Sequence, residues 1–97
     1  MNNVFEALAH PTRRKILELL KSGSKSAGDI ADKFDVAKPT MSRHFAKLKE
    51  AGLIQADQKG TTIFYSINLS TLEEVLLGFA DAIGMGPDKR KEEKSDA

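Results

Sequence analysis

The stretch from Phe34 to Gly52, FDVAKPTMSRHFAKLKEAG, decides how the rest of the chain is interpreted. Met41, Phe45 and Leu48 recur at helical spacing, so they share one face of a predicted helix. Basic and hydroxyl side chains occupy the other positions around it: Lys38, Thr40, Arg43 and Lys47. A helix with an apolar back and a basic front fits the major groove of DNA, but many surface helices have the same pattern. The neighbouring segments must decide between these interpretations.

The segment before this helix predicts a second, shorter helix. Pro39 suits the first turn of the basic helix, where its missing N–H costs nothing, and Gly52 is placed to end it. Ser26 is a good N-cap for a preceding helix over residues 27–34. About three residues, 35–37, join the two, which is typical of a helix-turn-helix.

A β-hairpin is predicted directly after the basic helix. Residues 53–57 have strand character, and residues 62–67 are rich in β-branched and aromatic side chains. Between them, Gln58-Lys59-Gly60-Thr61 is a turn signal with glycine where positive φ is needed. Two strands after a helix-turn-helix form a wing, and Lys59 at its tip is placed to reach a phosphate or the minor groove.

Two further helices precede these elements and one follows them. A short first helix, capped by Asn2 or Asn3, carries Val4, Phe5, Ala7 and Leu8, and a second helix covers roughly residues 11–21. The capping box Ser70-Thr71-Leu72-Glu73 opens a last helix that ends near Gly84. The predicted fold is therefore mainly α (α+β): a winged helix-turn-helix of order ααααββα over residues 1–83. Residues 84–97 are charged and lack large apolar side chains after Met85, so a disordered tail is expected there.

The first and last helices carry more apolar surface than one small domain can cover. Each large apolar side chain left in water forfeits ~1.5–3 kcal/mol of burial, which pairing with a second copy would recover. The alternative is that the last helix folds over its own domain. A two-fold dimer would place two basic helices ~34 Å apart, one turn of DNA, and read a palindrome. The expected interface consists of Val4, Phe5, Leu8, Leu72, Val75, Leu76, Phe79 and Ile83.

Composition and charge exclude several classes. The 97 residues include no cysteine, which excludes disulfides, thiolate metal sites and thiol redox sensing, and no apolar run is long enough to span a membrane. The N-terminus also lacks a signal-peptide pattern, so a cytoplasmic protein is expected. The net charge is only +1, but residues 10–60 hold 11 Lys+Arg against 6 Asp+Glu. This concentration of basic charge in the middle of the chain favours DNA as a partner.

One part of this basic charge stands at an unusual place. Arg13, Arg14 and Lys15 crowd the first turn of the predicted second helix, which is the unfavourable end of the helix dipole for cations. The cluster indicates either a negatively charged partner or ion pairs with Glu6 or Glu18. The sequence supports both equally.

Several stretches together resemble the ArsR-type winged-helix repressors: PTRRKIL (11–17), AGDIA (27–31), KPTMSRHFAKLKEAGLI (38–54) and KG…FYSIN (59–68). The start MNNVFEAL and the opening KP of the basic helix resemble the SdpR-like autorepressor subgroup in particular. The resemblance covers about residues 2–83. It implies a homodimeric bacterial transcriptional repressor whose terminal helices form the dimer interface, and many such proteins release DNA when a metal or another inducer binds.

The chain departs from the family pattern at a few positions. His10 stands where the family usually has Asp, and Arg43 stands where it usually has the first of two histidines. Arg43 can donate two hydrogen bonds to guanine, so we expect a different operator from that of relatives with histidine. His44 lies nearer the apolar face, where a structural hydrogen-bonding role is favoured over a phosphate contact.

Neither a sensor nor an enzyme is evident. The metal-sensing relatives use cysteines in the third helix or histidine-carboxylate pairs in the last one, and this chain has neither. No cofactor or metal is expected, and no Gly-rich phosphate loop or nucleophile motif points to catalysis. Release of DNA could then depend on expression level, on a protein antagonist or on an apolar inducer at the dimer interface.

The hypothesis is a sequence-specific repressor that binds double-stranded DNA as a homodimer. Residues at the front of the basic helix should reach base edges or flanking phosphates, while Ser26, Lys47 and Lys59 should contact phosphates. The expected DNA-binding residues are Ser26, Lys38, Pro39, Thr40, Ser42, Arg43, Lys47 and Lys59. The alternatives are a winged helix used for protein–protein contact, and a repressor that responds to an unidentified inducer.

Overall fold

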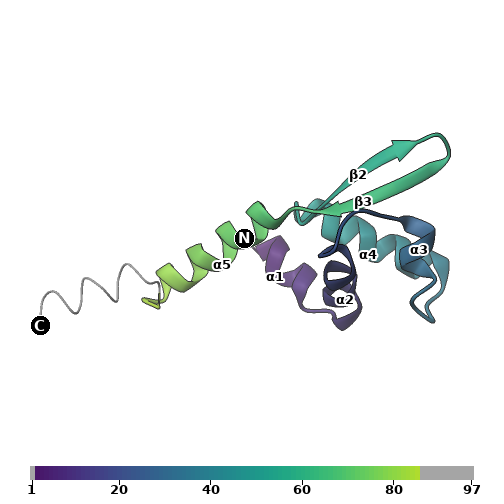
Figure 1. The fold of residues 1–97 in the computed structure, drawn as a ribbon. Coiled ribbons are helices and arrows are strands. Elements are labelled where there is room, and N and C mark those ends of the chain that lie inside the picture. Colours follow the sequence, from purple (N-terminus) through teal and green to yellow (C-terminus); the bar gives the residue numbers. More distant parts are fainter. Residues whose placement is uncertain (1, 86–97) are drawn as a thin grey trace, which may run out of the picture.

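The computed structural model describes residues 2–85 and has the predicted order of helices with one additional strand (Figure 1). The elements are α1 (Asn2–Leu8), α2 (Pro11–Leu20), β1 (Lys25–Ser26), α3 (Ala27–Ala31), α4 (Lys38–Glu50), β2 (Ile54–Lys59), β3 (Thr62–Ile67) and α5 (Leu69–Ala82). The prediction of a mainly α winged helix-turn-helix is confirmed. The tail predicted over residues 84–97 lies, beyond Met85, outside the described residues.

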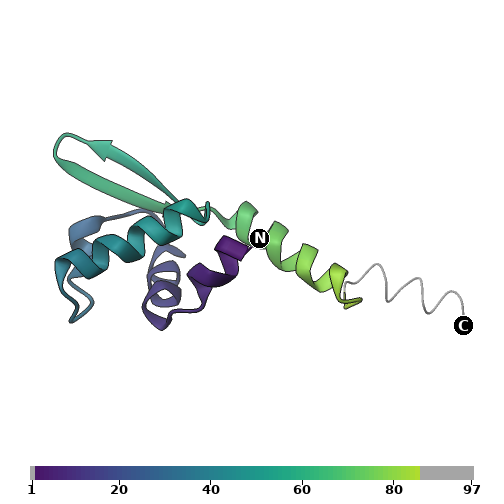
Figure 2. The same cartoon turned by 180° about the vertical axis from the view of Figure 1, so that it is seen from behind.

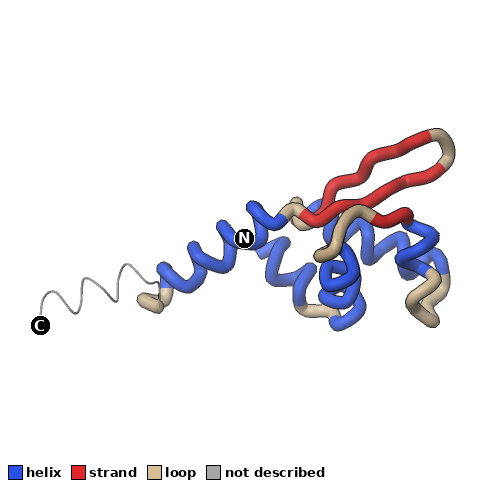
Figure 3. The backbone as a smooth tube through the Cα atoms, viewed as in Figure 1, coloured by secondary structure: helices blue, strands red, loops and turns tan. Residues whose placement is uncertain are grey.

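The sheet is antiparallel, in the order β1-β3-β2. Strands β2 and β3 pair from Ile54 with Ile67 to Lys59 with Thr62, and the hairpin projects from the helices as the predicted wing (Figure 3). Gly60 has a φ of 63° at its tip, a conformation that glycine adopts without strain. The short β1 pairs Lys25 with Tyr65 and joins the wing to α3.

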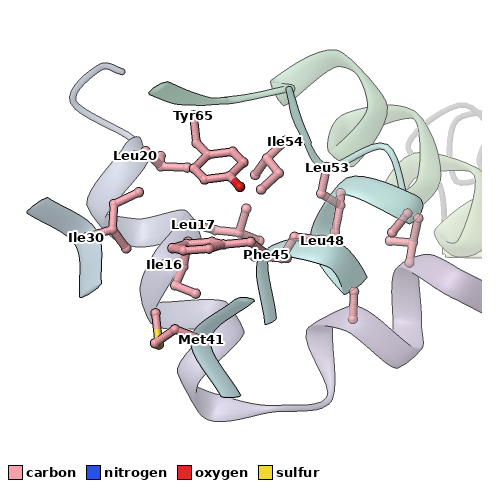
Figure 4. Packing of buried hydrophobic residues seen from close by; sticks show 13 residues of the cluster. Ile16, Leu17, Leu20, Ile30, Met41, Phe45, Leu48, Leu53, Ile54 and Tyr65 are labelled. Atoms are coloured by element: carbon pink, nitrogen blue, oxygen red, sulfur yellow. The ribbon is translucent and has the colours of Figure 1, made fainter. Parts of the chain in front are cut away.

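Helices α1, α2, α3 and α4 and the base of the wing enclose one hydrophobic core (Figure 4). Ile16, Ile30, Leu48 and Leu53 are completely buried. Phe45 stacks on Tyr65 with 4.6 Å between the ring centroids, which fixes the basic helix against β3. The apolar face expected for residues 34–52 is thus the face that α4 buries.

The helix boundaries follow from their caps. The Oγ atom of Ser26 accepts a hydrogen bond from the Asp29 N–H at 3.1 Å, as its predicted capping role requires. By contrast, α5 begins at Leu69, before the capping box that was predicted at Ser70. Its N-cap is Asn68, the residue after β3, whose side-chain oxygen accepts a hydrogen bond from the Thr71 N–H. Helix α3 is shorter than predicted, since the N–H of Phe34 bonds to the third residue before it in a tighter turn.

Helix α5 leaves the domain and extends past α1 (Figures 1 and 2). None of its 14 residues is buried. Its closest ring contact to the rest of the chain is the edge of Phe79 against Phe5 of α1, with centroids 5.1 Å apart. The helices within residues 2–85 are too short or too polar to cross a membrane.

Candidate nucleic-acid interface

The two faces of α4 are separated as the sequence pattern predicts. Its buried residues are Met41, His44, Phe45 and Leu48. Most of the residues expected to contact DNA lie on the exposed side: Lys38, Pro39, Ser42, Arg43 and Lys47. Thr40 is half-buried. The core therefore holds the back of α4 and leaves its basic front in solvent.

The front of α4 is continuous with α3 and the wing. A groove of about 200 Å³ separates α3 from α4 and is bordered by Lys38 and Ser42. A second groove, of about 370 Å³, lies between the start of α3 and the wing and is bordered by Ser26 and Thr62. Both grooves include Ala27 and Gly28, so they adjoin at the start of α3. The hydroxyl of Ser26 is on this face, and its proton is available to donate although the oxygen caps α3.

Lys59 is placed near the tip of the wing as expected. Its Nζ atom is 3.9 Å from an Asp57 carboxylate oxygen and 5.7 Å from the centroid of the Phe64 ring. Both Lys59 and Asp57 are strongly exposed, so the ion pair is weak and the ammonium can turn toward a phosphate.

Lys47 has a partner that the sequence did not reveal. Its Nζ atom donates to Glu6 Oε1 of α1 at 2.8 Å. This hydrogen bond and the accompanying charge attraction lower the pKa of Glu6 and raise the pKa of Lys47. Both groups are exposed, so solvent screens the pair, and a DNA phosphate could replace the carboxylate.

His44 has the structural role expected for it. It is 6% exposed, and its Nδ1 atom lies 3.2 Å from Nη1 of Arg13. Because a guanidinium only donates, Nδ1 of His44 accepts, and the imidazole is neutral with its proton on Nε2. The His10 ring lies beside it, with centroids 4.5 Å apart. Burial lowers the pKa of His44, and the neighbouring His10 and Arg13 lower it further.

Two of the three cations in the basic cluster at the start of α2, Arg13 and Arg14, have a different explanation from either of those weighed. Arg13 and Arg14 donate to backbone carbonyls at the end of α1. Arg13 donates to the carbonyls of Ala7 and Glu6, of which the second also accepts from the Ala9 N–H, and Arg14 donates to that of Leu8. The cations thus meet the negative end of the α1 dipole. Only Lys15 forms an ion pair of the expected kind, with Glu18 at 3.5 Å. The signal in the sequence was the position of two arginines in the first turn of α2, just beyond the short break that follows α1.

The residues expected at a dimer interface fall into three groups. Val4 is 4% exposed and packs into the protomer's own core, so little of its surface is left for a second copy, and its expected place at an interface stays a prediction. Phe5, Leu8, Leu72 and Val75 are half-buried within the protomer. Leu76, Phe79 and Ile83 are exposed, as are Leu69 and Leu77. Burial in the single chain thus leaves mainly the outer face of α5 uncovered.

Comparison with known proteins agrees with this architecture. A family model described as a helix-turn-helix domain matches residues 8–55. The chain is 46% identical over 86 residues to the transcriptional repressor SdpR of Bacillus subtilis (strain 168). The matched residues cover 89% of this chain and 96% of that protein. Its structure is similar to that of an ArsR family transcriptional regulator, with a TM-score of 0.77, 31% identity and coverage of 84% of each chain.

A second solved structure is a homodimeric winged helix-turn-helix DNA-binding domain from Mycobacterium bovis, a possible ArsR-family regulator. Its TM-score is 0.68 at 30% identity, covering 84% of this chain and 76% of that one. Fold and relatives define a transcriptional repressor with a helix-turn-helix DNA-binding domain, not an enzyme. The chain belongs to the ArsR-type winged-helix repressors.

Proposed function

We propose that the protein represses transcription as a homodimer that reads a palindromic operator, with one α4 helix in each half-site. The observation that carries this proposal is the exposure of α5. Helix α5 has 14 residues, none of them buried, and an exposed apolar stripe that continues to its C-cap, so it gains little from its own domain. The stripe consists of Leu69, Leu76, Phe79 and Ile83, which are 43–58% exposed.

A second copy of the chain is the simplest cover for this surface. Pairing α5 and the outer side of α1 across a two-fold axis would bury the stripe twice, once from each protomer. The same axis would relate the two α4 helices and predicts half-sites about 10 base pairs apart. The homodimeric winged-helix domain from Mycobacterium bovis supports this arrangement by its similarity.

The contacts with DNA divide into two kinds. Arg43 is the main candidate for reading bases, because its guanidinium can donate twice to guanine and it is exposed on the front of α4. Lys38, Thr40 and Ser42 would contact base edges or nearby phosphates, and Pro39 can contact a thymine methyl group. Phosphate contacts from Ser26, Lys47 and Lys59 would hold the protein in register without selecting sequence.

We infer further that the protein needs no resident metal or thiol to bind DNA. The chain has no cysteine. Among residues 2–85, histidines and carboxylates do not gather in a group of three that could hold a metal ion. Regulation would then come from the protein's own abundance, a protein antagonist or an apolar inducer, and the expected cytoplasmic location follows from action on DNA.

A salt titration separates this proposal from a winged helix used for protein contact. Mobility shifts of genomic fragments at ~50 and ~200 mM salt should show binding that weakens steeply, because each neutralised phosphate releases counterions. Preference for some fragments over others is also expected. Absence of any shift at the lower salt concentration would reject the proposal and favour the protein-contact alternative.

A metal panel tests the absence of a sensor. Purified protein should keep its operator affinity when Zn²⁺, Ni²⁺ or Co²⁺ is added, and after treatment with EDTA. A loss of affinity above about tenfold with any one metal would show that a sensor site exists, while leaving the DNA-binding role intact.

A further inference from the structure

The guanidinium of Arg13 joins two helices that have different tasks in the proposed dimer. From α2, its Nε atom donates to the Ala7 carbonyl at 2.7 Å and its Nη2 atom donates to the Glu6 carbonyl at 3.0 Å, both on α1. Its Nη1 atom donates to Nδ1 of His44 on α4 at 3.2 Å. All three nitrogens of one rigid, planar group are therefore engaged.

Helix α1 lies between the exposed stripe of α5 and the basic helix. On one side, Phe5 contacts Phe79 of α5. On the other, Val4 and Ala7 enter the core, while the carboxylate of Glu6 reaches Lys47 of α4. In a dimer formed through α5 and α1, the packing of α1 against α4 would therefore fix the position of α4 relative to the interface.

We propose that Arg13 is a positioning residue that fixes α4 relative to the dimer interface and thereby sets the spacing between half-sites that the protein accepts. This inference rests on the proposed function. Arg13 does not need to touch DNA: it is half-buried, and each of its three guanidinium nitrogens already donates one hydrogen bond within the protomer. Its effect is to make α1 and α4 move as one body.

The chemistry of the cluster requires arginine at this position. Three acceptors, two carbonyls and one imidazole nitrogen, surround the guanidinium in the directions of its N–H groups. A lysine ammonium could satisfy some of them but would not hold them in one plane. The apolar contacts of Val4 and Ala7 remain without Arg13, so the domain should still fold when the residue is replaced.

The test compares operators that differ only in the distance between half-sites. An operator is first selected with the wild-type protein from a random DNA pool, and duplexes are made with one base pair added or removed at its centre. One base pair rotates a half-site by about a tenth of a turn. Binding of each duplex is measured by fluorescence anisotropy for the wild type, Arg13→Ala and Lys15→Ala. Lys15→Ala is the matched control, because it removes a cation from the same turn of α2 that pairs with Glu18 and not with α1 or α4.

The wild type and Lys15→Ala should lose about tenfold or more in affinity when the spacing changes, as for a mismatched site. Arg13→Ala should bind the selected operator about tenfold more weakly and should change by less than about threefold between the three spacings. A merely unstable variant would bind all spacings more weakly by the same factor and would keep the wild-type preference. That result would overturn the inference.

The experiment distinguishes failure of the proposed function from failure of the role of Arg13. If the wild type selects no operator, the proposed function is wrong; if it selects one and Arg13→Ala keeps its spacing preference, only the role of Arg13 is wrong. Should circular dichroism show that Arg13→Ala is unfolded, Arg13→Lys replaces it. That variant should show a spacing preference weaker than that of the wild type, and an unchanged preference would equally reject the inference.

Discussion

Replacement of Leu76 by alanine tests whether α5 forms the dimer interface. Leu76 is 46% exposed in the protomer and shares a helical face with Leu72, Phe79 and Ile83. If a second copy covers this face, the side chain of Leu76 becomes buried in both protomers. Truncation to alanine then removes apolar contact twice in each dimer while leaving the fold of each protomer unchanged.

The size of the effect follows from the exposed fraction. Complete burial of a leucine side chain contributes ~1.5–3 kcal/mol, so burial of the 46% that is exposed contributes ~0.7–1.4 kcal/mol in each protomer. Two copies give ~1.4–2.8 kcal/mol, which corresponds to a dissociation constant about 10 to 100 times larger. Because alanine keeps the β-carbon, we expect a value toward the lower end, about 10 to 30 times.

Sedimentation equilibrium over a range of protein concentrations measures this constant directly. Leu77→Ala is the matched control: the residue is 60% exposed, but it is rotated about 100° around the helix from Leu76 and lies outside the stripe. Leu76→Ala should weaken the dimer and Leu77→Ala should not. Equal effects of the two variants, or a wild type that is monomeric at every concentration, would refute the assignment of the interface.

Substitutions at four further residues address α4. Arg43→Ala should cost ~1–3 kcal/mol of operator binding and relax base preference, while Lys47→Ala should weaken all sequences alike and lower the salt slope by about 1; equal losses on specific and random DNA for Arg43→Ala would contradict its role. Folding lowers the pKa of His44 from its ordinary value of 6.5. The contribution of His44 to the free energy of unfolding is therefore complete above pH 6.5 and is lost as the pH falls below that value. The urea midpoint of the wild type should therefore fall as the pH is lowered from 7.5 to 5.5, and that of His44→Asn, which cannot titrate, should fall less. The lowered pKa of Glu6 affects stability only at pH values below its ordinary pKa of 4.5. Finally, Leu48→Ala should destabilise the fold by ~2.7–5 kcal/mol in the same titrations, because Leu48 is 0% exposed, and a loss below ~1 kcal/mol would show that the core is described wrongly.

The fold was predictable because its signals are local. The spacing of Met41, Phe45 and Leu48 identifies the buried face of α4, and positive φ at Gly52 and Gly60 confirms where the helix stops and where the wing turns. The strand β1 was not predictable, because two residues are too few to show alternation. Its existence depends on pairing with β3, which is distant in the sequence.

The polar contacts between helices could not be predicted in the same way. The pairing of Lys47 with Glu6 joins residues 41 positions apart, and that of Arg13 with His44 joins residues 31 apart. The first depends on how α1 packs against α4, and the second on how α2 packs against α4. Val4 shows the same limitation: apolar character places a residue on a buried face, but the sequence does not reveal whether its own domain or a second copy buries it.

Selection of bound DNA from a random pool tests the central claim most directly. The wild-type protein should enrich a two-fold symmetric sequence whose half-sites are centred about 10 base pairs apart, with guanine at a fixed place in each half-site. The Arg43→Ala protein should enrich the same symmetry with less preference for that guanine. A single asymmetric site, or no enriched sequence, would contradict a dimer that reads DNA through two α4 helices.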